Sequence, residues 1–125
     1  MSSSIYCSFI ALDNVYHVRY NINMKTIYRY QLPNGKIPFE EWLNKLDNTQ
    51  KAKVLVRLER LKLGLYGNCK TISNELKELK FESGLRIYFY EENDIIVILL
   101  NGGNKQRQSK DIEVAKKYIQ DYKSK

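Results

Sequence analysis

The stretch that decides the fold runs from Glu78 to Ala115 and reads ELKFESGLRIYFYEENDIIVILLNGGNKQRQSKDIEVA. Apolar residues alternate with an arginine and two tyrosines over residues 85–90, LRIYFY, which predicts a strand with one apolar and one polar face. Residues 95–100, IIVILL, form an unbroken apolar run, typical of a central strand buried on both faces. The run ends at residues 101–105, NGGNK, which predicts a turn with a cation at its exit. A cationic strand face beside a cationic loop indicates a polyanionic partner.

The rest of the chain predicts further elements around these strands. Pro38 suits the first turn of a helix, and an apolar stripe follows it at helical spacing. Asp47 and its neighbours offer caps for a longer helix that ends near Leu63, and Ser109 offers one for a final helix. The expected strands are residues 26–31, 75–81, 85–91 and 95–100. The predicted fold is therefore α+β, with the order β-α-α-β-β-β-α and helices packed on one face of a small, mainly antiparallel sheet.

Bulk properties narrow the class of protein. At 125 residues the chain is one domain, and 43% hydrophobic with 28% charged residues predicts a folded, soluble protein. A net charge of +7 favours an acidic partner: nucleic acid, an acidic protein or an anionic membrane surface. Cys7 and Cys69 are isolated and His17 is the sole histidine, so we expect no metal site and a reducing, cytoplasmic location. No apolar stretch approaches the roughly 20 residues that span a bilayer.

Residues 1–23 differ from the remainder. They hold one basic residue, Arg19, one acidic residue, Asp13, and no helical stripe. We interpret them as an N-terminal extension or a start-site artefact, in which Val15–Tyr20 has the pattern of an extra strand. The functional domain is then residues 24–125.

Four motifs, in order along the chain, also carry a family resemblance. They are residues 34–43, residues 57–67, the segment GLRIYF at 84–89, and GGNK at 102–105 with the following Gln108 and Asp111. From about Met24 onward the chain resembles the RelE/ParE superfamily of toxins, and most closely its HigB-like addiction module killer proteins. The family usually has aspartate where this chain has Asn104.

The resemblance implies a function and partners. It implies the same fold, and the toxin of a type II toxin–antitoxin pair acting as a ribosome-dependent mRNA endonuclease that inhibits translation. The implied partners are a helix-turn-helix antitoxin, the ribosome and mRNA, with no membrane and no cofactor. Two alternatives stay open: a ParE-like inhibitor that binds DNA gyrase, and an inactive relic that retains only antitoxin binding.

Candidate catalytic residues follow from the strand alternation. Lys80, Arg86, Tyr88 and Lys105 are expected to converge on one concave, open face of the sheet. RNA cleavage without metal needs an activated 2′-OH, a stabilised phosphorane and a protonated 5′-oxygen. We assign the phosphorane to Arg86, whose planar fork holds two oxygens, phosphate positioning to the lysines, and stacking or proton transfer to Tyr88. Alternatively, Arg86 pairs with Glu82 or Glu78, and Tyr88 only covers the sheet.

A second set of cations is predicted on the long helix. Lys53, Arg57 and Arg60 lie at i, i+4 and i+7, so they share one helix face. This face is either simply solvated or, together with Arg107 and Gln108 after the glycine loop, binds RNA phosphates. No histidine lies in the resembling region, so the sequence offers no obvious general base.

Overall fold

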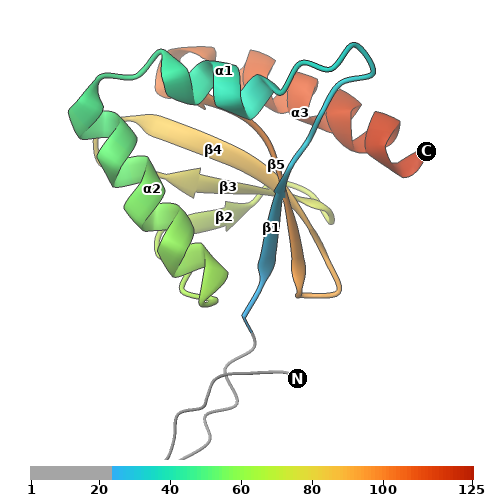
Figure 1. Cartoon of the computed structure of the whole chain (residues 1–125), viewed down its shortest axis with the longest axis horizontal. Coiled ribbons are helices and arrows are strands. Elements are labelled where there is room, and N and C mark those ends of the chain that lie inside the picture. The colour runs from blue at the N-terminus through green and yellow to red at the C-terminus, as the bar shows by residue number, and fades with distance from the viewer. Residues whose placement is uncertain (1–23) are drawn as a thin grey trace, which may run out of the picture.

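The structure, a computed structural model, describes residues 24–125. A five-stranded sheet runs in the order β1-β5-β4-β3-β2, and each neighbouring pair is antiparallel except the parallel pair β1 and β5 (Figure 1). This confirms the predicted α+β class and its mainly antiparallel sheet, and adds a short strand, β2, that the sequence analysis did not predict. In chain order the elements are β1 Thr26–Arg29, α1 Pro38–Asn44, α2 Asn48–Lys62, β2 Cys69–Thr71, β3 Leu76–Lys80, β4 Leu85–Glu92, β5 Ile96–Asn104, a 3-10 turn Lys105–Arg107, and α3 Gln108–Lys123.

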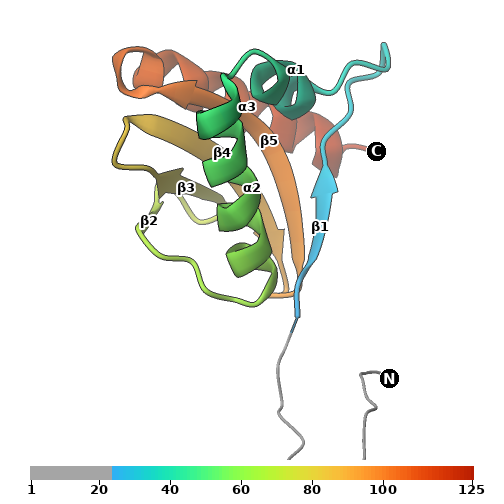
Figure 2. The same cartoon turned by 60° about the vertical axis from the view of Figure 1, so that its left-hand side comes forward.

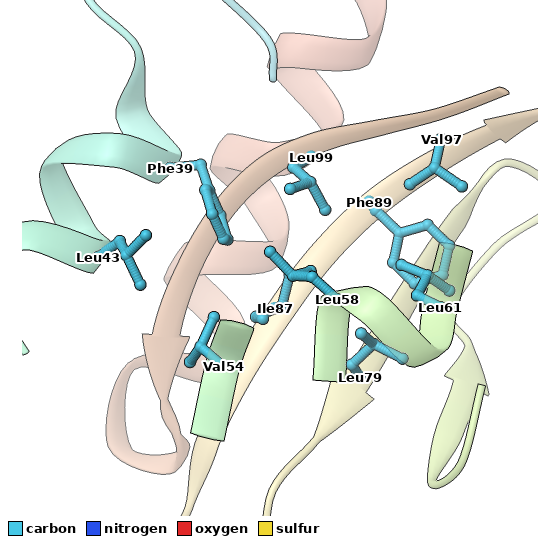
Figure 3. Close-up of a cluster of buried hydrophobic side chains, with 10 residues drawn as sticks. All are labelled: Phe39, Leu43, Val54, Leu58, Leu61, Leu79, Ile87, Phe89, Val97 and Leu99. Carbon is cyan, nitrogen blue, oxygen red and sulfur yellow. The ribbon is translucent and has the colours of Figure 1, made fainter. Parts of the chain in front are cut away.

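Helices cover both faces of the sheet, which corrects the prediction that all of them pack on one face. In Figure 2, α2 lies in front of the sheet. Figure 3 shows the cluster that α1 and α2 form with it: Phe39, Leu43, Val54, Leu58, Leu61, Leu79, Ile87, Phe89, Val97 and Leu99. A second cluster lies under α3 and contains Tyr30, Leu76, Tyr88, Tyr90, Ile98, Leu100, Ala115 and Ile119. Odd- and even-numbered residues of the apolar run thus face different helices, as expected for a strand buried on both sides.

The helix starts follow from local chemistry. Pro38 opens α1, where its missing N–H costs no hydrogen bond. The side chain of Asp47 caps α2 by accepting a hydrogen bond from the Gln50 backbone N–H at 2.8 Å. The expected Ser109 cap is wrong, because α3 already begins at Gln108. Instead, the Asn104 side chain accepts from the Arg107 N–H at 3.2 Å and caps the preceding 3-10 turn.

The glycine pair near the end of β5 lies inside the strand, which corrects the predicted turn over residues 101–105. A Cβ atom at Gly102 would overlap the indole ring of Trp42 on α1, and one at Gly103 would overlap the carboxylate of Asp111 on α3. The two glycines therefore allow helices on opposite faces to approach the strand backbone closely. This close approach sets the position of the first turn of α3 over the sheet.

Candidate nucleic-acid interface

An open groove of about 550 Å³ lies between α2 and the turn that joins β3 to β4. Three of the predicted RNA-binding cations, Lys53, Arg57 and Arg60, line it from α2. The rest of its lining comes from Ala52 and Val56 on α2, and from Asn68, Lys80, Phe81, Glu82 and Ser83. The structure therefore brings the α2 cations together with one predicted catalytic residue, Lys80.

Arg57 builds the wall of this groove. Its guanidinium donates to the backbone oxygens of Tyr66 at 3.2 Å, Asn68 at 2.8 Å and Lys80 at 2.9 Å, and it lies over the ring of Phe81. Burial lowers the pKa of Arg57, although an arginine remains charged at neutral pH. With its donors committed to carbonyls, Arg57 joins α2 to the sheet and adds positive charge to the groove.

Besides the half-buried Lys80, the groove has two cations that remain available to a ligand, Lys53 and Arg60. Both are exposed, and neither forms an ion pair with any carboxylate of residues 24–125. Unpaired cations beside a groove attract phosphate groups without base specificity. The groove is thus suited to groups that carry phosphate.

Arg86 does not lie on an open face, contrary to the sequence-based expectation. It is 6% exposed, and its Nε is 3.4 Å from Oε2 of Glu78, a carboxylate that is fully buried. The Nη1 group donates to the backbone oxygen of Gly84 at 3.0 Å. The pairing of Arg86 with Glu78, one of the alternatives considered from the sequence, is what the structure contains.

Tyr88 is also covered, by α3. Its side chain is fully buried, and the phenol oxygen has no hydrogen-bond partner among the described residues. Burial, and then the nearby Glu78 carboxylate, raise the pKa of Tyr88 well above its usual value. The phenol therefore stays protonated at neutral pH and is a proton donor rather than a base.

The remaining predicted residues lie at the same end of the sheet. Lys80 pairs in register with Arg86, which pairs with Gly103 on β5, and Lys105 follows directly after β5. Lys105 and Arg107 are exposed in the 3-10 turn. The predicted catalytic residues therefore lie close together on neighbouring strands at one end of the sheet, but they do not share one open surface.

Gln108 is half-buried, and its amide contacts another side chain of the protein. Its Nε2 donates a hydrogen bond to Oε2 of Glu78 at 2.8 Å, so the amide that was predicted to bind RNA instead binds a buried carboxylate of the protein. Asn101 lies nearby and donates from Nδ2 to the backbone oxygen of Asp111 at 3.2 Å. Burial raises the pKa of Asp111, whose Oδ2 has no hydrogen-bond partner in the described part of the chain.

The sequence analysis named Glu78 only as an alternative partner of Arg86 and Asp111 only as part of a motif, and gave neither a place in the site. The signal for Glu78 was an acidic residue on a predicted strand, between Lys77 and Leu79, at the position that pairs in register with Tyr88. The sequence marked Asp111 only as an acidic residue in the first turn of a helix. Its proximity to Gly103 depends on how α3 docks on the sheet. Within residues 24–125, no three metal-ligating side chains form a cluster, and no helix is long and apolar enough to cross a membrane.

Comparison with known proteins then gives the family. Residues 41–121 match the model of the phage-derived Gp49-like proteins (DUF891). The chain belongs to this Gp49-like family. It is also 40% identical over 88 residues to an uncharacterized protein of Haemophilus influenzae, covering 68% of this chain and 89% of that relative. Membership of the Gp49-like family agrees with a phage-derived, toxin-like protein of an addiction module, and the closer RelE/ParE relation remains a prediction.

Proposed function

We propose that this protein is the toxin of a type II toxin–antitoxin pair and arrests translation as a ribosome-dependent mRNA endonuclease that needs no metal. The observation that carries the proposal is the groove beside α2, where Lys53 and Arg60 are unpaired among the described residues and line an open channel. The net charge of +7 adds long-range attraction for RNA. The motifs that resemble HigB-like toxins, among them Gly102 and Gly103, also support this class of toxin.

In this proposal each group has a defined part in the reaction. Lys53 and Arg60 hold the RNA backbone, and Lys80 and Lys105 position the phosphate to be cleaved. The guanidinium of Arg86 stabilises the phosphorane, because its planar fork matches two phosphate oxygens. Tyr88, with its raised pKa, is suited to protonate the 5′-oxygen as the bond from phosphorus to that oxygen breaks, while the proton of the attacking 2′-OH passes to solvent water, from which the phenol regains its proton. Tyr88 is fully buried under α3 and Arg86 is 6% exposed, so contact of these two groups with RNA requires a local rearrangement of the residues that cover them.

The proposed partner is a helix-turn-helix antitoxin that covers the cationic surface. Leu55 and Val56 on α2 are 44% and 53% exposed, and Val56 also lines the groove. Exposed apolar side chains beside unpaired cations fit a partner segment that carries both apolar and acidic residues. Such a segment would exclude RNA from the groove.

The same observations support an alternative from another class, a ParE-like protein that inhibits DNA gyrase by contact alone. Arg86 and Tyr88 are buried, which favours a non-catalytic role, and the exposed Leu55 and Val56 fit a protein-protein contact. A relic that only binds antitoxin is the third possibility. These alternatives differ from the nuclease in what fails first in the cell.

Induction of the protein alone in bacteria distinguishes them. The nuclease proposal predicts growth arrest with protein synthesis, measured by pulse labelling, falling before DNA synthesis. A DNA-damage response with translation intact would favour the gyrase inhibitor, and normal growth at high soluble expression would favour the relic. Co-expression of the adjacent helix-turn-helix gene should restore growth in either toxic case.

A further inference from the structure

Glu78 is a buried carboxylate that two other elements contact at the same oxygen. It lies on β3 with no exposed surface, and its Oε2 is 3.4 Å from Nε of Arg86 on β4 and accepts from Nε2 of Gln108 on α3 at 2.8 Å. Three elements therefore meet at one oxygen atom. Since an unpaired buried carboxylate is costly, the contacts with Arg86 and Gln108 offset part of the cost of burying Glu78.

These contacts fix the orientation of the guanidinium. Arg86 is held at Nε by the Glu78 carboxylate and at Nη1 by the Gly84 carbonyl, 3.0 Å away. An arginine has several rotatable bonds, so an unsupported guanidinium samples many orientations, whereas two fixed partners select one. The Nε contact is an ion pair without hydrogen-bond geometry, so the Glu78 carboxylate attracts the guanidinium to this position while the hydrogen bond to Gly84 gives it a direction.

Gln108 in turn holds the carboxylate of Glu78 by a hydrogen bond, and the position of Gln108 is set by the start of α3. It is the first residue of α3, directly after the 3-10 turn that Asn104 caps. The lack of a side chain at Gly103 lets Asp111, one turn further along, approach β5 closely. The start of α3 is thereby pressed against the sheet, with the Gln108 amide directed at Glu78.

We propose that Glu78 and Gln108 are positioning residues for Arg86. Glu78 sets the orientation of the guanidinium and Gln108 sets the orientation of Glu78, so the docking of the first turn of α3 controls how Arg86 is presented to a phosphate. The inference rests on the proposed function, in which Arg86 stabilises the phosphorane. It gives Gln108 a role other than the direct RNA contact expected from the sequence.

The first test is a double-mutant cycle on mRNA cleavage. Gln108→Met keeps the side-chain length and removes the amide donor, and the exposed Gln106→Met is the matched control. We expect Gln108→Met to lower kcat by about 10- to 100-fold with little change in KM, as loss of a supporting contact does, and Gln106→Met to have no effect. In an Arg86→Lys background, where no fork remains to be oriented, Gln108→Met should cost less than about twofold more. Equal losses in both backgrounds would show that Gln108 does not act through Arg86.

The second test does not depend on activity. In the ¹⁵N NMR spectrum of the whole chain, the Arg86 Nε–H signal should be single and slowly exchanging in the wild type and in Gln106→Met. It should broaden or exchange faster in Gln108→Met and Glu78→Gln. An unchanged signal in folded Gln108→Met protein would overturn the positioning role even if the wild type cleaves RNA. A changed signal in a protein that cleaves no RNA would retain the positioning role and refute the proposed function instead.

Discussion

Removal of Arg86 should destabilise the protein far more than loss of a surface arginine. Glu78 is fully buried, and Arg86 is the one cation that forms an ion pair with it within residues 24–125. Removing one partner of a buried pair leaves an uncompensated charge and typically costs about 3–5 kcal/mol. Arg86→Ala should therefore lose about that much of its free energy of unfolding. A strand residue that faces solvent would lose only about 0–1 kcal/mol.

Equilibrium unfolding in urea, followed by far-UV circular dichroism at pH 7, measures this loss. With urea slopes of about 1–3 kcal/mol per molar, a loss of 3 kcal/mol moves the midpoint down by at least about 1 M. Arg60→Ala is the control, because it also removes an arginine but from the exposed face of α2. It should stay within about 0.5 kcal/mol of the wild type.

A double replacement separates charge from packing. Glu78→Leu combined with Arg86→Met removes both charges and keeps apolar volume, and such exchanges of buried pairs are often neutral or stabilising by about 1–4 kcal/mol. The double variant should thus be clearly more stable than Arg86→Ala. The reasoning fails if the free energy of unfolding of Arg86→Ala lies within about 1 kcal/mol of the wild-type value, or if the double variant is as unstable as Arg86→Ala.

Three further predictions concern other parts of the fold. Because burial raises the pKa of Asp111, the folded state prefers its protonated form, so the stability that Asp111 adds is greatest below about pH 4 and falls as pH rises. The melting temperature of Asp111→Asn should therefore rise relative to that of the wild type between pH 4 and pH 7. A difference in melting temperature that does not change with pH would contradict this. Gly102→Ala should cost about 1–3 kcal/mol in urea unfolding, partly relieved by Trp42→Leu, because the added methyl group meets the indole ring; a neutral Gly102→Ala would refute the close approach. A chain that begins at Met24 keeps the buried pair of Lys25 with Glu91 and should melt within about 4 °C of the full chain, whereas a larger drop would make residues 1–23 part of the domain.

The fold was largely predictable because the spacing of apolar residues indicates whether a segment is a helix or a strand and which of its faces is buried. The alternation over residues 85–90 and the apolar run that follows gave β4 and most of β5, and Pro38 and Asp47 marked the starts of α1 and α2. Alternation separates the two faces of a strand, but it does not show whether a helix covers the polar face. Arg86 and Tyr88 were therefore expected on an open surface, and instead Tyr88 lies under α3 and Arg86 is buried beside Glu78.

The candidate site was harder to predict because it depends on long-range docking. The glycines of β5 read locally as a turn, and only Trp42 and Asp111, from helices on opposite faces, explain them as strand residues. The contact of Gln108 with Glu78 joins residues 30 positions apart, and no local pattern reveals it. By contrast, Lys53 and Arg60 were found from helical spacing alone, because residues i and i+7 of one helix share a face whatever the tertiary fold. Residues 1–23, with the proposed strand at Val15–Tyr20, lie outside the described residues.

The most direct test of the proposed function is cleavage of mRNA on translating ribosomes, mapped by primer extension in a purified translation system. The groove variant Lys53→Glu/Arg60→Glu should be compared with Lys116→Glu/Lys117→Glu, which makes the same charge change at exposed positions of α3. We predict discrete cleavage by the wild type and by the α3 variant, and loss of cleavage by the groove variant, with normal melting of all three proteins. Intact mRNA with the wild type, or cleavage by the folded groove variant at the wild-type rate, would contradict the proposal.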